Sequence, residues 1–478
     1  MKVFLRIQLV LVSLFTVCSV QSQVLVSATD LGLFPKALIS FSGLTNAEYN
    51  VQMYKVTYNT TDNTGANVIA SGMIAVPINS NCDSLPIALY AHGTVLLREG
   101  VPSRNNDESL LGKAFASRGY VTAMPDYLGL GDLPGLHPYQ HAESEARVSV
   151  DIIRATIEFM EDSLSYIYNN QVYLSGYSQG GHTAMATHKY IQDNNLETEL
   201  NVIASAPLSG SFHSSSTQAR IVLDDMPFGS QGFVIYMIMA YNDVYGGIYT
   251  TPSDYLQSPY DVTIPPLLDG NHDFTELNDS LPNLPSQFLD PTFLANLLAD
   301  SSTKSTSLWQ ALLDNDNYDW KPNVPMKLFY CSGDQTVFPQ NTLDAFDAMT
   351  ANGAAQVFKE DLGNLSHTGC ILPAISNAIN FFENLRPNCG VPASVSPVVV
   401  ESFEIQLSPN PSSQMLEITS NSLNPVILSV YSITGVEVHQ SNFSNTVQLD
   451  VSNWKNGLYY VKTASDKHTS FQPLVIQH

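Results

Sequence analysis

The spacing of apolar residues changes along the chain, and each spacing predicts a different kind of structure. Between residues 30 and 210, short continuous apolar runs alternate with stretches of helical periodicity. The runs at 85–90, 120–123 and 172–175 are typical of buried strands, and residues 144–160 have the period of an amphipathic helix. Because strands alternate with helices here, we expect an α/β fold with a mostly parallel sheet flanked by helices.

This alternation breaks at residue 208 and resumes with an apolar run at 326–331, followed by a predicted strand at 356–358 and a helix over 372–385. The insertion of residues 208–321 is too long for a loop, so we expect a separate subdomain. Its apolar side chains either line a pocket for an apolar ligand or form only the subdomain's own core. They are Phe233, Val234, Ile235, Tyr236, Met237, Ile238, Met239, Tyr241, Tyr245, Tyr249 and Tyr255.

The N-terminus differs from this central region. Lys2 and Arg6 precede an apolar stretch that ends in small residues, which predicts a secretory signal peptide over residues 1–22. An N-terminal anchor helix is the alternative, but the stretch is short for spanning a bilayer. No later apolar run is long enough either, so we expect no transmembrane segment after cleavage.

The C-terminal part has a composition of its own. Residues 391–399 are small and punctuated by proline, which predicts a linker after a large domain over residues 23–390. Residues 400–478 contain no stretch of helical periodicity. Their short apolar runs, separated by Asn, Ser and Gly, predict an all-β sandwich.

Export would place the remaining cysteines in an oxidising compartment, where disulfides form. In a parallel sheet, Cys331 ends its strand at the edge where Cys370 begins a helix. Cys82 precedes a strand and Cys389 ends a helix, both at the opposite edge. Of the pairings that four cysteines allow, we therefore predict Cys331–Cys370 and Cys82–Cys389.

Composition excludes several functions. The chain carries 20 Lys and Arg against 44 Asp and Glu, a net charge of −24 that would repel a phosphate polymer and argues against nucleic-acid binding. Because it has no His-Glu-x-x-His and no paired Cys-x-x-Cys, we expect no metal site and no cofactor. The acidic run at 314–319 lacks the downstream glutamate of a calcium loop and is interpreted as a solvated turn.

The segment Gly176-Tyr177-Ser178-Gln179-Gly180 carries the sharpest chemical pattern. By chance alone, about one in six chains of this length would contain a G-x-S-x-G. The structural context of the motif therefore decides whether its serine is a nucleophile. Here it follows the predicted strand at 172–175 and opens a predicted helix over 181–192. A nucleophilic serine of this kind requires that strand-to-helix setting. The start of the helix would also point its dipole at Ser178, where negative charge develops during acyl transfer.

A serine hydroxyl becomes a nucleophile only when a base takes its proton and an acid orients that base. In a fold of this kind the three residues follow in the order Ser, acid, His. Asp334 directly follows the predicted strand at 326–331, and His367 lies in a loop before the last helix. We therefore predict Ser178, His367 and Asp334 as the catalytic residues.

Other residues remain candidates for these roles. His213 and, less readily, His182 are the alternatives for the base. The alternatives for the acid precede their strand and would lie at its wrong end; they are Asp314, Asp316 and Asp319.

An oxyanion hole needs two backbone N–H donors. One is expected from Gln179, the residue after the nucleophile, and the other from Thr94 in the loop after the strand at 85–90. His92 is interpreted as a brace for that loop. The pattern assigns no substrate-binding residue.

Taken together, the motifs of residues 30–390 resemble those of the α/β-hydrolase superfamily and, within it, the secretory lipase group. The resemblance implies a Ser–His–Asp esterase or lipase with a lid inserted before the strand that carries the acid. The motifs are His92-Gly93-Thr94, Pro125-Asp126-Tyr127-Leu128-Gly129-Leu130-Gly131, His137-Pro138-Tyr139 and Gly176-Tyr177-Ser178-Gln179-Gly180-Gly181.

Residues 400–478 resemble the type A C-terminal sorting domain of the type IX secretion system. The similarity lies at 407–411, 430–435 and 449–461. It implies an address for export through the outer membrane, with the type IX secretion machinery as partner and the cell surface or the medium as destination. A carbohydrate-binding or adhesive β-sandwich is the alternative.

These features predict a secreted serine carboxylic-ester hydrolase that acts on a small-molecule or lipid ester through an acyl-enzyme. A serine peptidase on the same fold and a non-catalytic surface-binding protein are the alternatives. The peptidase lacks support because the N-terminal propeller expected of prolyl-peptidase relatives is missing. The complete set of catalytic residues argues against the surface-binding protein.

Overall fold

The computed structural model describes residues 23–78, 82, 84–164, 166–386, 405–420, 425–432, 437–465 and 468–478. The predicted signal peptide, the predicted linker and Cys389 lie outside the described residues. The division of the chain into domains therefore stays a prediction, and the elements are given below as the structure has them.

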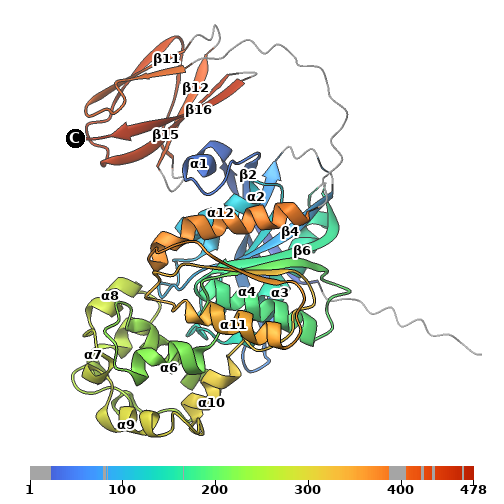
Figure 1. Ribbon diagram of the computed structural model, residues 1–478. Helices are drawn as coiled ribbons and strands as arrows, with labels where there is room; N and C mark the ends of the chain where they lie inside the picture. Colours follow the sequence, from blue (N-terminus) through green and yellow to red (C-terminus); the bar gives the residue numbers. More distant parts are fainter. Residues whose placement is uncertain are drawn as a thin grey trace, which may run out of the picture.

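A mostly parallel sheet forms the centre of the described residues between 23 and 386 (Figure 1). Its strands are β1 (Leu25–Phe34), β2 (Asn50–Thr61), β3 (Asn67–Ile78), β4 (Ser84–Ala91), β5 (Val121–Pro125), β6 (Ile167–Tyr177), β7 (Val202–Leu208), β8 (Met326–Tyr330) and β9 (Val357–Asp361). They pair in the order β1-β2-β3-β5-β4-β6-β7-β8-β9. The pairs from β5 through β9 are parallel, which confirms the predicted fold class.

The first three strands depart from the simple alternation expected between residues 30 and 210. β1, β2 and β3 form an antiparallel meander, and β3 pairs antiparallel with β5. Buried and less buried positions largely alternate along β2. Such alternation is typical of antiparallel strands with one partly solvated face. The central parallel strands β4, β5 and β7 are instead buried along nearly their whole length.

Helices cover both faces of this sheet (Figure 1). On one face lie α2 (Asp107–Ala116) and α12 (His367–Leu385), and on the other lie α3 (Ala142–Asp162), α4 (Gln179–Asp193) and α11 (Gln340–Ala351). Two short helices, α1 (Lys36–Phe41) and η1 (Pro102–Arg104), complete this part.

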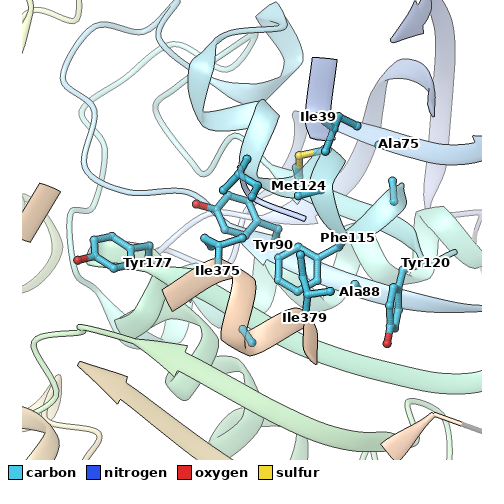
Figure 2. Packing of buried hydrophobic residues seen from close by; sticks show 14 of the residues in the cluster. Ile39, Ala75, Ala88, Tyr90, Phe115, Tyr120, Met124, Tyr177, Ile375 and Ile379 are labelled. Atoms are coloured by element: carbon cyan, nitrogen blue, oxygen red, sulfur yellow. The ribbon is translucent and has the colours of Figure 1, made fainter. Parts of the chain in front are cut away.

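The sheet separates two hydrophobic cores, and β4 contributes to both. Ala88 and Tyr90 pack with α2 and α12, and Figure 2 shows Ile375 of α12 beside Tyr90 and Ile379 beside Phe115 of α2. The alternate β4 residues Ile87 and Leu89 pack instead with α3. Alternate side chains of a strand point to opposite faces of the sheet, and both faces of β4 are buried.

The chain between β7 and β8 is helical. Its apolar residues form a separate core, in which Tyr236, Tyr241 and Trp309 are almost completely buried. The elements are η2 (Ser214–Gln218, a π-helical turn), α5 (Arg220–Leu223), α6 (Gly232–Tyr245), η3 (Pro252–Asp254), α7 (Tyr260–Thr263), η4 (Pro265–Leu268), α8 (Phe274–Asp279), η5 (Pro285–Gln287), α9 (Pro291–Ala299) and α10 (Ser307–Asp314).

The described residues from 405 onward form antiparallel sheets, as the all-β prediction requires. One sheet joins β10 (Ile405–Ser408), β11 (Met415–Ser420) and β14 (Thr446–Asp450). The other joins β13 (Glu437–Phe443), β12 (Val426–Ser432), β15 (Gly457–Ser465) and β16 (His468–Ile476). Leu416 and Ile418 from the first sheet share one hydrophobic core with Leu428, Val430 and Val461 from the second.

A disulfide joins Cys331 and Cys370, and it confirms that predicted pair. Cys331 directly follows β8, Cys370 lies in the first turn of α12, and both are completely buried. Cys82 is also disulfide-bonded, but the predicted partner Cys389 lies outside the described residues, so the second pairing stays a prediction.

Replacing both Cys331 and Cys370 by Ala should lower the free energy of unfolding. The bond spans a sequence separation of 39 residues, and closing a loop of that length in the unfolded chain is worth about 4 kcal/mol in the chain-entropy model. Urea denaturation of the wild type and the double variant measures the difference. A loss well below 1 kcal/mol would contradict a stabilising role.

Lys113 of α2 should make stability depend on pH. Its side chain is buried against the Phe34 ring and donates a hydrogen bond to Asn105, and burial lowers its pKa to about 7. Between pH 7 and 10.5 the unfolded chain therefore binds more protons, and this group's contribution to stability rises with pH. The stability of Lys113→Met relative to wild type should fall by roughly 3 kcal/mol from pH 7 to pH 10.

Urea unfolding of both proteins at the two pH values measures this change. Loss of the hydrogen bond to Asn105 changes the variant's free energy of unfolding by a similar amount at each pH. The change of the wild-type-to-variant difference between the two pH values therefore reports the titration of the Lys113 ammonium group alone. An equal difference in the free energy of unfolding at pH 7 and pH 10 would contradict the proposed shift of the Lys113 pKa.

Candidate active site

Ser178 lies at the sharp turn between β6 and α4, in a backbone conformation that side-chain-bearing residues rarely adopt. Its φ and ψ are 60° and −118°. Such conformations persist only where the surrounding structure enforces them, and they cluster at functional sites. The Ser178 N–H donates to the Leu208 carbonyl of β7 at 3.0 Å, which fixes the turn to the neighbouring strand.

The glycines on either side of Ser178 are required by close packing of the backbone. A Cβ atom at Gly180 would lie 1.9 Å from the Ala91 carbonyl oxygen at the end of β4. One at Gly176 would lie 2.3 Å from the Gly180 carbonyl oxygen. The first turn of α4 can therefore pass against the end of β4 only because both positions lack a side chain.

Ser178, His367 and Asp334 form one chain of hydrogen bonds. His367 Nδ1 lies 2.6 Å from Asp334 Oδ2, and His367 Nε2 lies 2.9 Å from Ser178 Oγ. Because a carboxylate only accepts, Nδ1 carries the proton and donates it to Asp334. Nε2 is then left as the acceptor for the Ser178 hydroxyl, which is the arrangement in which an imidazole can remove the hydroxyl proton.

Backbone groups hold Asp334 in place. It is 4% exposed, and its Oδ1 accepts from the N–H groups of Thr336 and Val337, each at 2.9 Å. One carboxylate oxygen is thus occupied by the main chain, and the other faces His367. The side chain cannot turn away from the imidazole without leaving those two buried donors unpaired.

His367 is the first residue of α12, so its predicted place in a loop before the helix is wrong. The helix expected over 372–385 begins five residues earlier because the Ser366 side chain caps it, accepting from the Gly369 N–H. The Tyr177 hydroxyl donates to the His367 carbonyl at 2.5 Å. Cap and tyrosine together fix the backbone that carries the imidazole.

The alternative bases are engaged elsewhere. His213 Nδ1 lies 2.7 Å from Asp344 Oδ2, and its ring stacks on Tyr318. His182 is completely buried, with its ring nitrogens facing Glu145 and the Asn315 carbonyl. Neither ring has a recorded hydrogen bond to Ser178 in the described part of the chain.

The alternative acids also have other partners. Their hydrogen bonds pair Asp314 with the Tyr245 hydroxyl, Asp316 with Ser215, and Asp319 with Asn352. Among the residues that the structure describes, no group of three or more His, Cys, Asp or Glu side chains could hold a metal ion.

The two predicted oxyanion donors lie in segments that touch. Gln179 is the first residue of α4, so its N–H has no acceptor within the helix. Thr94 lies in the loop after β4, and α4 packs against the end of that strand. In that loop the Gly93 N–H already donates to Glu108 at 3.1 Å, while the Thr94 N–H has no acceptor among the described residues.

His92 occupies the base of the same loop. Its ring is completely buried, with Nε2 3.3 Å from the Asp126 carbonyl and Nδ1 2.7 Å from the Gly93 carbonyl. It also packs on the Tyr127 ring. These contacts link the loop to the segment after β5.

An apolar cavity of about 840 Å³, its open mouth included, adjoins Ser178. Phe233, Val234, Met237 and Ile238 line it from one face of α6. Further walls come from the insertion, from segments after β7 and β8, and from the Tyr139–Gln140 segment before α3. They include Gln218, Ala219, Val222, Leu297, Leu308, Trp309, Leu312, Thr336 and Val337.

The cavity wall and the insertion's own core share residues of α6. Val234 and Ile238 belong to both, whereas Ile235 and Tyr236 are buried in the core without lining the cavity. The cavity-lining positions 233, 234, 237 and 238 lie on one face of the helix. That this cavity takes an apolar acyl chain stays a prediction.

The sequence-based prediction missed the side chains beneath Ser178. Glu145 of α3 is 1% exposed and accepts from the Gln179 side chain at 2.7 Å. His137 accepts from the same Gln179 amide, also at 2.7 Å. One observation could have found Glu145: it falls on the apolar face of an amphipathic helix, where a carboxylate needs buried donors.

Among the described residues, no helix is both long and apolar enough to cross a membrane. Residues 406–477 match the model of the secretion system C-terminal sorting domain. Curated proteins gave no match to the chain.

Solved structures resemble the remainder of the chain. A hydrolase structure from Legionella pneumophila is 28% identical, covers 76% of this chain and 98% of its own, and has a TM-score of 0.70. The ligand-bound rice cell wall degrading esterase LipA from Xanthomonas oryzae is 30% identical, covers 76% and 99%, and has a TM-score of 0.66. Candida antarctica lipase A, at 14% identity, 77% and 83% coverage and a TM-score of 0.53, shares the fold.

The parallel sheet, the turn that carries Ser178 and the similarity to these hydrolases agree with one another. The protein is a hydrolase, and its C-terminal sorting domain directs it to the cell surface or out of the cell. The chain belongs to the lipase and esterase group of the α/β-hydrolase superfamily.

Proposed function

We propose that the protein is a serine carboxylic-ester hydrolase that acts through an acyl-enzyme, with Ser178 as nucleophile, His367 as base and Asp334 as the acid that orients it. The observation that carries the proposal is the unbroken hydrogen-bond chain from Ser178 Oγ through the imidazole to Asp334. A serine hydroxyl in this arrangement can lose its proton as it attacks.

In the first half of the reaction, Ser178 Oγ bonds to the acyl carbon while its proton passes to His367 Nε2. The carbonyl electrons move to oxygen, and the imidazolium then gives the proton to the leaving alkoxide, which departs as the alcohol. In the second half, water loses a proton to His367 and attacks the acyl-enzyme, and the proton returns to Ser178 Oγ as the acid leaves.

The N–H groups of Thr94 and Gln179 are proposed to stabilise the oxyanion. Both are free of acceptors in the described residues, and they lie in segments held together where α4 meets the end of β4. The N-terminus of α4 adds its partial positive charge at the same point. Preorganised donors of this kind usually contribute the largest single part of the rate enhancement in acyl transfer.

The cavity beside Ser178 favours an ester with an apolar acyl chain. Its walls are mainly Leu, Ile, Val, Phe and Met side chains, and Ser178 lies in the wall itself. An apolar chain placed there would be removed from water close to the attacking oxygen. An ester with a short acyl chain would make fewer of these apolar contacts and would therefore bind less tightly.

We also propose the division of the chain on which this function rests. Residues 1–22 would be a signal peptide, 23–390 the catalytic domain with its lid at about 208–321, 391–399 a linker, and 400–478 the sorting domain. The type IX secretion machinery would recognise that last part, while catalysis would belong to the domain before it.

Purified protein should hydrolyse p-nitrophenyl esters, and Ser178→Ala should lower kcat by roughly 10⁶-fold. His367→Ala should have a comparable effect, whereas His213→Ala should retain activity because that side chain pairs with Asp344. Turnover of peptide anilides in place of esters would favour the peptidase. Full ester hydrolysis by Ser178→Ala would exclude this proposal.

Filling the cavity should shorten the acyl chain that the enzyme accepts. Ala219 lies in the cavity wall, so Ala219→Trp should lower kcat/KM for p-nitrophenyl palmitate at least about tenfold more than for the acetate, since each buried CH₂ contributes about 0.8 kcal/mol. Ser216→Trp, at an exposed position of the π-helical turn that directly precedes Ala219, is the matched control. Equal losses for both esters would argue against acyl binding in this cavity.

A further inference from the structure

Glu145 is a buried carboxylate with no part in the reaction described above. It lies in the first turn of α3, directly beneath the turn that carries Ser178, and is 1% exposed. Burying a carboxylate is strongly unfavourable unless hydrogen bonds replace the water that it loses. The groups that donate hydrogen bonds to Glu145 therefore indicate which segments it keeps in position.

Both oxygens of Glu145 are occupied by donors from described residues. Oε1 accepts from the Gln140 backbone N–H at 2.9 Å and from Gln179 Nε2 at 2.7 Å. Oε2 accepts from the Thr183 hydroxyl at 2.7 Å and lies 3.1 Å from His182 Nδ1. One carboxylate thus joins the segment before α3 to the first two turns of α4.

His182 supports the negative charge of this carboxylate. Its Nδ1 faces Glu145 and its Nε2 faces the Asn315 carbonyl at 3.1 Å, so both nitrogens face acceptors. Burial acts to raise the pKa of Glu145, but His182, with His137 and Thr183, lowers it below its usual value.

The first connection leads to the proposed oxyanion donor on α4. The amide nitrogen of the Gln179 side chain donates to Glu145 Oε1 and to His137 Nε2, each at 2.7 Å. His137 can accept because its Nδ1 donates to the Leu128 carbonyl and because burial lowers its pKa to about 4. The side chain of Gln179 is anchored at both hydrogens, which fixes the residue whose backbone N–H faces the site.

The second connection leads to the other proposed donor. Gln140, whose N–H donates to Glu145, has a left-handed backbone with φ of 56°. Its Nε2 donates to the Tyr139 hydroxyl at 3.3 Å, and that hydroxyl lies 3.1 Å from Thr94 Oγ1. Since Tyr139 accepts from Gln140, its own proton is free for Thr94. The loop after β4 is thereby tied to the same carboxylate.

We propose that Glu145 is a positioning residue for the oxyanion hole, which holds Gln179 directly and Thr94 through Gln140 and Tyr139. It touches neither substrate nor the reacting atoms. The inference rests on the proposed function, because an oxyanion forms only if Ser178 attacks a carbonyl. A displacement of either N–H would weaken an interaction that exists in the transition state, and ground-state binding would change little.

The test compares Glu145→Leu, which removes both acceptor oxygens, with Glu145→Gln, which can keep the one that faces Gln140 and Gln179. In the Gln variant the amide oxygen can accept from Gln140 and Gln179, and its NH₂ can donate to a neutral His182. Asp151→Leu is the matched control: Asp151 is a mostly buried carboxylate on the same helix, bound to Thr60 and Arg154.

For p-nitrophenyl butyrate, Glu145→Leu should lose about 100-fold in kcat with KM within about threefold of wild type. The inhibition constant of an alkyl trifluoromethyl ketone, whose adduct with serine carries the oxyanion, should rise by a similar factor. Glu145→Gln should retain kcat within about fivefold. Asp151→Leu should leave the kcat of the folded protein unchanged, even if it lowers the free energy of unfolding.

Equal losses of kcat in Glu145→Leu and Asp151→Leu would overturn the proposal, as would an unchanged inhibition constant in Glu145→Leu. If Glu145→Leu does not fold, Gln179→Leu tests the direct connection, since it keeps the backbone N–H and loses only the anchor. A wild-type kcat in that variant overturns the proposal. Activity in Ser178→Ala would instead show that the proposed function has failed.

Discussion

The contact between the end of β4 and the first turn of α4 is the constraint on which the site depends. The Ala91 carbonyl lies where a Cβ of Gly180 would be, so the two backbones approach without side chains between them. This approach forces the turn at Ser178 into its rare conformation and brings the loop with Thr94 beside the start of α4. The strain at one residue is offset by the hydrogen bond to Leu208 and by the packing of the parallel strands around it.

The residues that the sequence placed correctly are those whose positions follow from local rules of the chain. Ser178 follows a buried strand and starts a helix, and Asp334 follows the next strand past the insertion; both lie at the same sheet edge because the strands are parallel. His367 was assigned by order in the chain, yet its helix starts earlier than expected. The Ser366 side chain caps α12 at this earlier start, and the helix continues through Pro373.

Glu145 shows why the rest could not be predicted. Its position in α3 is visible as a carboxylate on an apolar face, but its donors come from segments before α3 and on α4. Which of many polar residues meet it depends on the packing of two helices on one sheet face. The same limit applies to α6, which is apolar nearly all round: core and cavity wall require the same residue types, so only the fold separates them.

The groups proposed to perform chemistry come from other parts of the chain than most of the residues that line the cavity. Asp334 and His367 both follow the insertion, and the disulfide between Cys331 and Cys370 joins the segments that carry them. Ser178 and the proposed oxyanion donors lie on the strands and helices before the insertion. The insertion meets the buried network at Asn315, whose carbonyl faces His182 and whose side chain accepts from the Ala142 N–H. The helices of the insertion supply none of the hydrogen bonds proposed to activate Ser178, because Ser178, His367 and Asp334 all lie outside it.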